Sequence, residues 1–332
     1  MRFSILLDVL NAGFMKNSLV FFLLVVFPVM LFGQKSNGFV VAEDSLIHLS
    51  YKILNERDEF VRFEAAKFFD EMLFSTLEKP GSFDYSFDSL TSVSIQIPDD
   101  RSFRIFTWGI PKQDGTYDYG GVLQVNTGKT SGKIYHLNDL SAELQNPEGL
   151  VLSPKNWYGA LYYKLLTSTY KDNTIYTLLG WDACFVQSRR KVIEILSFNK
   201  AGEPFFGAAA FTRFPRKVKR VIFEHSSRVS MTLNYSEQAI KVKSGKKASK
   251  PQYKAVHKEM IVFDRLIPQD PQLEGVFQFY VPETNVYDGF LFEKGKWQFV
   301  KDVDARNPER EGKALPKSKK ESGLLPPPGP KK

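Results

Sequence analysis

Two tryptophans and two aspartates are the residues of this chain whose types and positions could form a binding cleft. Trp108 is expected at the end of a strand, beside the loop that contains Asp114, and the pair Trp181 and Asp182 is expected at the end of a second strand. Aromatic rings and carboxylates at strand ends are typical of clefts that bind sugars or peptides. The same pattern also fits a half-buried Trp that closes the core and an Asp that stabilises a turn.

The sequence contains none of the common catalytic or metal-binding motifs. HExxH, G-x-S-x-G and G-x-G-x-x-G are all missing. Gly128-Lys129-Thr130 lacks the upstream glycine of a phosphate-binding loop, and the four histidines are scattered along the chain. The single cysteine, Cys184, excludes an intramolecular disulfide and a paired-cysteine metal site. We therefore expect no metal and no cofactor, and the sequence identifies no catalytic residue.

A hydrolase built from carboxylates is the alternative that the sequence leaves open. Carboxylates are plentiful, but two acids that face each other across a cleft cannot be identified in a chain whose strand pairing is unknown. A pocket that holds two acids of raised pKa would favour a hydrolase. An exposed aromatic groove or an unpaired strand edge would favour a binding protein.

Basic residues are concentrated in two segments rather than spread over the chain. Residues 241–258 hold seven Lys and no acidic residue, and residues 308–332 hold seven Lys or Arg and three Glu. The net charge of the whole chain is +8, so the rest of the chain is net negative. A nucleic-acid-binding fold presents a basic face, and we therefore expect no nucleic-acid partner. We expect 241–258 to be a solvated loop and the tail to make weak contacts with anionic surfaces.

The N-terminal part of the chain is typical of a secretory signal peptide. An apolar run, residues 19–32, follows Lys16 and ends before Gly33 and Gln34. This run is shorter than the roughly twenty residues that a membrane-spanning helix needs. Met15 is the expected true start, so residues 1–34 comprise an upstream extension and the signal peptide. We expect the mature chain to have no transmembrane span and to be periplasmic or secreted.

The end of this apolar run, Leu31-Phe32-Gly33-Gln34, resembles the signal peptides of uncharacterised secreted proteins of the Bacteroidota. The resemblance covers the signal peptide alone. It implies export, and it implies no particular activity for the mature chain.

One helical region is expected, over residues 42–78. Its apolar residues recur at helical spacing, Asp44 or Ser45 can act as N-cap, and Pro80 ends the region. Arg57 and Asp58 mark an expected break between a short helix and a longer one.

Short strands are expected from residue 91 onwards, separated by turn signals at regular spacing. The densest apolar run, residues 174–211, predicts three buried strands: 174–181, 191–198 and 204–211. The fold class that follows is α+β and predominantly β. We expect one β-rich domain, residues 35–305, built as an antiparallel meander in an open sheet, a sandwich or a barrel. One or two N-terminal helices pack on it.

Residues 306–332 are rich in Pro, Lys and Gly and predict a disordered basic tail. Taken together, these features favour an exported, non-catalytic binding or structural protein of the cell envelope. Its partner is expected to be an envelope component or an extracellular ligand that the sequence does not identify. The alternative remains a secreted hydrolase whose carboxylates come together only in the fold.

Overall fold

The computed structural model describes residues 38–128, 131–244 and 252–304 of the chain. The predicted signal peptide, residues 1–34, and the predicted tail, residues 306–332, lie outside these ranges. None of the helices within them is long and apolar enough to cross a membrane.

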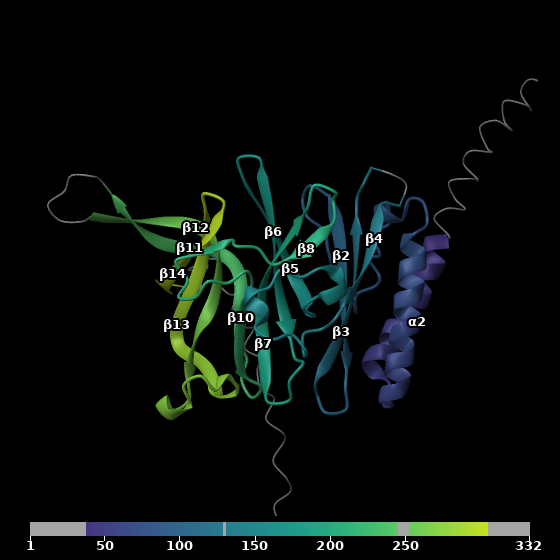
Figure 1. The fold of residues 1–332 in the computed structure, drawn as a ribbon, viewed down its shortest axis with the longest axis horizontal. Helices are drawn as coiled ribbons and strands as arrows, with labels where there is room; N and C mark the ends of the chain where they lie inside the picture. Colours follow the sequence, from purple (N-terminus) through teal and green to yellow (C-terminus); the bar gives the residue numbers. More distant parts are fainter. Residues whose placement is uncertain (1–37, 129–130, 245–251, 305–332) are drawn as a thin grey trace, which may run out of the picture.

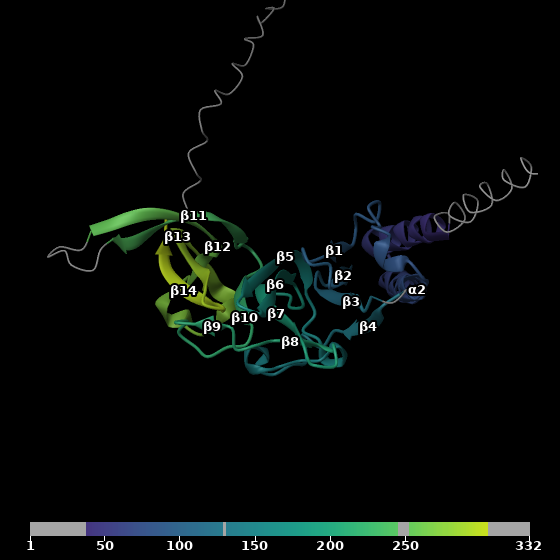
Figure 2. The same cartoon turned by 90° about the horizontal axis from the view of Figure 1, so that it is seen from above.

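Two helices and three antiparallel sheets form four layers along the long axis of the molecule (Figure 1). The helices form one outer layer, and Figure 2 shows the three sheets following one another from this layer to the opposite end. This arrangement confirms the predicted class: a mostly β protein with two N-terminal helices packed on antiparallel sheets, which are open. The first sheet comprises β1 (Ser94–Gln96), β2 (Phe103–Pro111), β3 (Tyr117–Val125) and β4 (Lys133–Asn138), in this order.

The second and third sheets are also built mainly from consecutive strands. The second has the order β10-β7-β6-β5, with β8 paired to β7, and comprises β5 (Leu161–Tyr170), β6 (Asn173–Asp182), β7 (Ser188–Phe198), β8 (Pro204–Phe206) and β10 (Val221–Ser226). The third has the order β11-β12-β13-β14-β9 and comprises β11 (Leu233–Ser244), β12 (Gln252–Pro268), β13 (Tyr280–Glu293), β14 (Lys296–Val303) and the short parallel strand β9 (Phe211–Thr212).

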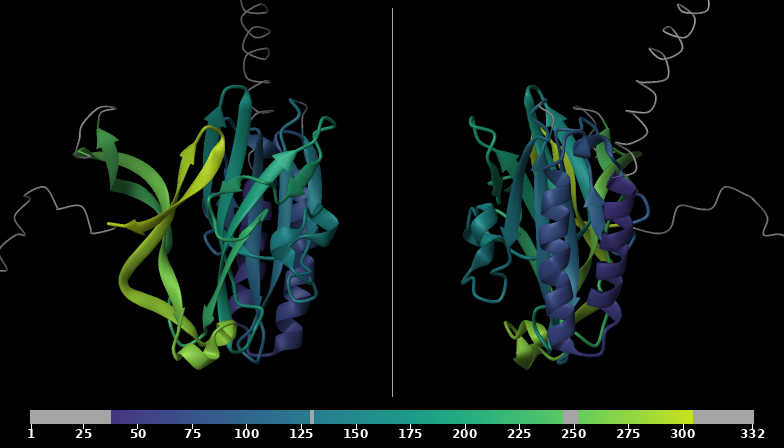
Figure 3. Two further views of the ribbon diagram at one scale, coloured as in Figure 1. Left: turned by 60° about the vertical axis from the view of Figure 1, so that its left-hand side comes forward. Right: turned by 90° about the vertical axis from the view of Figure 1, so that its right-hand side faces the viewer.

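The helical layer consists of a helix over 38–55 and of α2 (Glu59–Leu77), which lie side by side on the first sheet (Figure 3). Asp58 separates them: its backbone is extended and its side chain accepts a hydrogen bond from the Phe60 N–H at 2.8 Å, as an N-cap does. The N-cap predicted at Asp44 or Ser45 is wrong, because both residues lie inside the first helix. The Ser45 hydroxyl donates instead to the carbonyl of Val41, one turn earlier.

The side chains of each sheet alternate between the layers on its two faces. On β2, Phe106 and Trp108 pack against the helices, whereas Phe103 and Ile105 pack against the second sheet. Because a strand directs successive side chains to opposite faces, a strand buried on both faces is apolar throughout. The second sheet has this property, since apolar neighbours fill both of its faces. This burial explains why residues 174–211 form the densest apolar run.

Two predicted segments differ in the structure. The Lys-rich residues 241–258 were expected to form a loop, but β11 runs to Ser244 and β12 starts at Gln252, so much of this segment lies in a hairpin. The predicted strand 204–211 is divided into β8 and β9. Gly207 causes the division, because its φ of +98° is outside the range of an extended strand.

His225 of β10 gives the fold a measurable pH dependence. The side chain is buried and donates from Nδ1 to the carbonyl of Ser226 at 2.9 Å. Burial lowers the pKa of His225 below its usual 6.5. The unfolded chain therefore binds this proton more readily than the folded chain, and stability falls as the pH drops through the unfolded value.

We expect the melting temperature of wild type to fall more than that of His225→Asn between about pH 7.5 and about pH 5.5. The variant lacks the titrating ring, so it loses this part of the acid destabilisation. Thermal denaturation followed by circular dichroism measures the difference, and exposed His48→Asn serves as the control. Equal pH dependence of wild type and His225→Asn would contradict the assignment.

Candidate ligand-binding pocket

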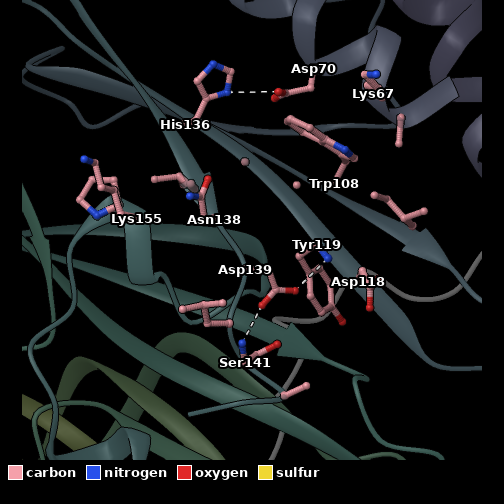
Figure 4. A pocket seen from close by; sticks show the side chains of 18 of the residues that line it. Lys67, Asp70, Trp108, Asp118, Tyr119, His136, Asn138, Asp139, Ser141 and Lys155 are labelled. Atoms are coloured by element: carbon pink, nitrogen blue, oxygen red, sulfur yellow. Dashed lines mark hydrogen bonds and ion pairs between the residues drawn. The ribbon is translucent and has the colours of Figure 1, made fainter. Parts of the chain in front are cut away.

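A pocket of about 1010 Å³ lies between α2, the strands β2 to β4 of the first sheet and the segments that follow β4 (Figure 4). We call it the α2–β4 pocket. Phe63, Ala66, Lys67 and Asp70 of α2 form one wall. Residues of β2, β3 and β4, the segment after β4, the pair Pro154 and Lys155, and Cys184 form the rest of the lining.

Two glycines of β3 leave room for two side chains that line the pocket. A Cβ atom on Gly120 would lie 2.2–2.4 Å from the indole ring of Trp108, and one on Gly121 would lie 2.9 Å from the Leu137 side chain. Only glycine therefore allows Trp108 to lie across β3. The indole also packs edge-to-face on Phe69 of α2, with ring centroids 4.8 Å apart, so it is fixed between the helix and the sheet.

Replacement of Gly120 tests this geometry. We expect Gly120→Ala to destabilise the protein by about 1–3 kcal/mol, because the new methyl group forces Trp108 out of its position. Gly149→Ala is the matched control, since a Cβ atom there meets nothing within 4 Å. Denaturant unfolding measures both changes. An unchanged free energy of unfolding in Gly120→Ala would show that Trp108 is not fixed against β3.

An aspartate–histidine pair connects α2 with β4 at the pocket. His136 Nδ1 lies 3.1 Å from Asp70 Oδ2, and the imidazole stacks on Phe74 with ring centroids 4.0 Å apart. Burial raises the pKa of the Asp70 carboxyl, while His136 acts in the opposite direction. In Figure 4 the second ring nitrogen of His136 points away from the other labelled side chains. The pair therefore holds the two walls together more than it presents a base to the pocket.

The carboxylate of Asp139 has a different environment. It accepts hydrogen bonds from three backbone N–H groups: those of Tyr119 at 3.0 Å, Ser141 at 2.8 Å and Gly159 at 3.1 Å. Burial raises the pKa of Asp139, and these hydrogen bonds oppose the rise. A carboxylate whose two oxygens both accept from backbone groups is a structural link, here between β3, the turn after β4 and the segment before β5.

Two buried hydrogen-bond donors that border the pocket have no partner. Within the described residues, three buried side-chain atoms are unpaired: Arg62 Nε, Trp108 Nε1 and Tyr135 Oη. Both Trp108 and Tyr135 line the pocket. Buried polar groups are almost always hydrogen-bonded, so each exception calls for an explanation. The two side chains lie on opposite faces of the first sheet, Trp108 towards α2 and Tyr135 towards the second sheet. On the α2 side, a bound molecule with an acceptor oxygen would supply the partner that Trp108 lacks.

The charged groups of the pocket divide into engaged and free ones. Asp118 pairs with Lys112 at 2.7 Å, in addition to the engaged carboxylates described above. Lys67 and Lys155 line the pocket, are exposed and make no ion pair in the described part of the chain, and Glu143 is likewise exposed and unpaired. Among the described residues, the lining thus carries two lysines and four carboxylates, and only Asp118 has a lysine as its partner.

The four residues that the sequence singled out are separated in the structure. Trp108 alone lines the α2–β4 pocket, where it is buried. Asp114 is exposed in the β2–β3 turn and accepts hydrogen bonds from the backbone N–H and the hydroxyl of Thr116 at 2.9 and 2.6 Å. Trp181 packs edge-to-face on Tyr117, with ring centroids 5.2 Å apart. Neither of these two residues is part of the pocket lining.

Asp182 lies beyond the pocket in a buried polar network. Its carboxylate accepts from the Tyr158 hydroxyl at 2.7 Å and from the Cys184 N–H at 2.8 Å, and Arg190 lies 3.9 Å away. The Cys184 thiol is 3.4 Å from the same carboxylate, and burial raises its pKa. The thiol is therefore protonated, although Cys184 borders the pocket.

Sequence reasoning did not find most of the pocket. Asp70, His136 and Lys155 come from a helix, an edge strand and a 3₁₀ turn that are distant in the sequence. No motif connects them. The nearest available signal was the pair of adjacent glycines in β3, which marks a place where side chains or a ligand approach the backbone closely.

Among the described residues, no group of three or more His, Cys, Asp and Glu side chains is placed to hold a metal ion. Comparisons of the chain with protein-family models, with curated proteins and with solved structures gave no match.

Proposed function

We propose that the protein is an exported, non-catalytic binding protein of the cell envelope and that its ligand occupies the α2–β4 pocket. The observation that carries the proposal is the unpaired buried donor Trp108 Nε1 at the pocket, on the side of the first sheet that faces α2. A ligand that supplies an acceptor oxygen would satisfy it. The volume of about 1010 Å³ is at the upper end of the range for sites that bind small molecules.

The state of the carboxylates supports binding over catalysis. A general acid or base needs a carboxyl group that is free to exchange a proton with the substrate. Asp70 is held by His136, and Asp139 accepts from three backbone N–H groups. Both are engaged in holding the walls of the pocket together.

A hydrolase is the second candidate, and one observation favours it. Asp70 and Asp139 line the same pocket, and burial raises the pKa of both. Raised carboxyl pKa values in one pocket are a common feature of acid–base catalysis. Incubation of the identified ligand with wild type and Asp70→Asn distinguishes the two functions: cleavage that the variant lacks would establish the hydrolase.

A pocket-filling variant tests the proposed site. Ala142 is exposed on the pocket lining, so Ala142→Trp places an indole in the pocket without replacing a core residue. Ala201→Trp is the matched control in the exposed β7–β8 turn. We expect wild type and Ala201→Trp to bind the same members of a saccharide and peptide array, and Ala142→Trp to lose them. Retention of every ligand by Ala142→Trp would place binding elsewhere.

Export is tested separately from binding. The proposal of a periplasmic or secreted location is supported by the signal-like residues 1–34. Fractionation of cells that express the full chain, followed by sequencing of the N-terminus of the exported product, gives the result directly. We expect a mature start after Gly33 or Gln34. A cytosolic chain that keeps residues 19–32 would contradict the proposal.

A further inference from the structure

We propose that a second cavity, between the second and third sheets, binds an uncharged apolar small molecule. We call this cavity, which has a volume of about 740 Å³, the inter-sheet pocket. Among the described residues none lines both this pocket and the α2–β4 pocket, so the site goes beyond the proposed function. Three features carry the inference: an aromatic lining, a balanced set of charges and a strand edge that is already occupied.

The walls of the inter-sheet pocket come from both sheets and from the segments that border them. The second sheet contributes β10, and the third contributes β12, β13 and β14. Strands β10 and β13 lie next to each other (Figure 1). The segments 144–149 and 214–218 and the 3₁₀ turn Phe277–Phe279 border the cavity. Its volume lies within the range of roughly 300–1,000 Å³ that is typical of small-molecule pockets.

Aromatic rings line the inter-sheet pocket from both sheets. Phe223 of β10 and Phe263 of β12 pack across the interface, with ring centroids 4.4 Å apart. Phe214 and Phe299 extend this aromatic surface, with ring centroids 5.4 Å apart. Phe277 also lines the pocket and remains 47% exposed. An apolar ligand would remove these ring surfaces from water, which is the main source of affinity in a pocket of this kind.

The charged side chains of the lining balance one another. Four are cationic and four are anionic: Arg190, Arg216, Lys217 and Arg265, and Glu148, Glu224, Asp264 and Asp288. Three ion pairs join members of the two sets: Glu148 with Arg216, Glu224 with Arg190, and Asp288 with Arg265. The remaining two, Lys217 and Asp264, have opposite signs. The lining therefore carries no net charge, and a charged ligand would lose its hydration without gaining a counter-charge.

An extended peptide fits the inter-sheet pocket less well than a small molecule. Peptides of this kind gain much of their affinity by adding a strand to a free sheet edge, and β10 is an edge strand of the second sheet. At Ile222 that edge is already used. The Ile222 N–H donates to the Glu148 carboxylate at 2.9 Å, and the Ile222 carbonyl accepts from Arg216 at 3.2 Å.

Fluorescence titration of the chain without its predicted signal peptide tests the inference. The probe is N-phenyl-1-naphthylamine, an uncharged molecule whose emission rises in apolar surroundings. We expect saturable binding to wild type and at least about tenfold weaker binding to Gly149→Trp. Gly149 is exposed on the pocket lining and a Cβ atom there meets nothing within 4 Å, so the indole can occupy the cavity. Ala201→Trp, in the exposed β7–β8 turn, is the control and should bind as wild type does.

A second variant removes part of the lining instead of filling the cavity. Phe277→Ala should weaken probe binding by about fivefold, because the ligand loses one aromatic contact. Phe68→Ala is the matched control, since Phe68 is 53% exposed and lies outside the lining. Displacement of the probe by three molecules with the same chain tests the charge of the ligand. We expect 1-dodecanol to displace it at a lower concentration than dodecanoate or dodecylammonium.

Four results would overturn the inference. They are the absence of saturable probe binding, equal affinity of wild type and Gly149→Trp, equal affinity of wild type and Phe277→Ala, and displacement by either ion at a lower concentration than by 1-dodecanol. Loss of the probe in Ala142→Trp alone would also contradict it, because the apolar ligand would then lie in the α2–β4 pocket. The proposed function is tested with a saccharide and peptide array, so the two proposals can fail independently.

Discussion

Glu194→Ala is expected to destabilise the protein by about 3–5 kcal/mol, one of the two largest effects predicted for a single substitution. Glu194 of β7 and Arg220 form an ion pair at 2.6 Å in which both side chains are fully buried. Burial raises the pKa of Glu194, and Arg220 opposes that rise. Removal of the carboxylate leaves the guanidinium as an uncompensated buried charge.

The other contacts of Arg220 explain why the chain cannot easily accommodate this loss. The guanidinium also donates to the carbonyls of Pro147, Leu150 and Phe206, so it joins the segment between β4 and β5 to β8. The cation cannot turn towards solvent without breaking these hydrogen bonds.

Urea unfolding of Glu194→Ala, Glu194→Gln and wild type measures the effect. Glu194→Gln keeps the shape and one acceptor oxygen, so it should be less destabilising than the alanine variant. Exposed Glu203→Ala is the control and should change the free energy of unfolding by less than about 0.5 kcal/mol. A Glu194→Ala protein within about 1 kcal/mol of wild type would mean that the pair contributes no more than a surface ion pair.

Arg104→Lys is the second large effect, with an expected loss of about 2–4 kcal/mol. The Arg104 side chain is fully buried, and none of its hydrogen-bond partners is a carboxylate. It donates to the Gln124 side chain at 2.8 Å and to the carbonyls of Tyr85 and Ser82, each at 2.6 Å. A lysine ammonium cannot reproduce the planar fork that reaches all three acceptors.

Aromatic rings replace the missing counter-ion of Arg104. The guanidinium carbon lies 5.4 Å from the ring centroid of Phe83, 5.2 Å from that of Phe87 and 5.0 Å from that of Phe106. These cation–π contacts stabilise a desolvated charge. Burial lowers the pKa of Arg104 to about 9, so the group is still a cation at neutral pH.

Unfolding of Arg104→Lys and of the control Arg101→Lys, whose native side chain is 58% exposed, checks this prediction. The control variant should be as stable as wild type, because the Arg101 guanidinium makes one long ion pair at the surface. Equal stability of both variants would show that the fork geometry at residue 104 is not required.

The fold class could be predicted because it depends on helical spacing and turn signals, which are local features of the sequence. Helical spacing and the break at Asp58 mark the two helices, and the turn signals mark most strand boundaries. The Lys-rich hairpin was missed, because pairing between β11 and β12 overrides a composition that disfavours strands. The candidate pocket was missed for a different reason: Lys67, His136 and Lys155 meet only after the helices pack on the first sheet.

The sequence also could not predict which charged side chains are buried. Nothing distinguishes Arg104 or Arg220 from an exposed arginine until the strands are paired. Of the four residues chosen for their chemistry, Trp108 borders the pocket, and Asp114, Trp181 and Asp182 stabilise turns and packing around it. The predicted position of Trp108 at a strand end is wrong, because β2 continues to Pro111 and Trp108 lies inside the strand. Trp181 is near the end of β6, as predicted, but it does not line the pocket.

The layered order of the fold has a consequence for the way the chain folds. Each layer consists almost entirely of consecutive elements, from the helices to the third sheet. Synthesis proceeds from the N-terminus, so the helices and the first sheet can form before the residues of the third sheet have been synthesised. The contact between Trp297 and Thr177, which are far apart in the sequence, belongs to the final step.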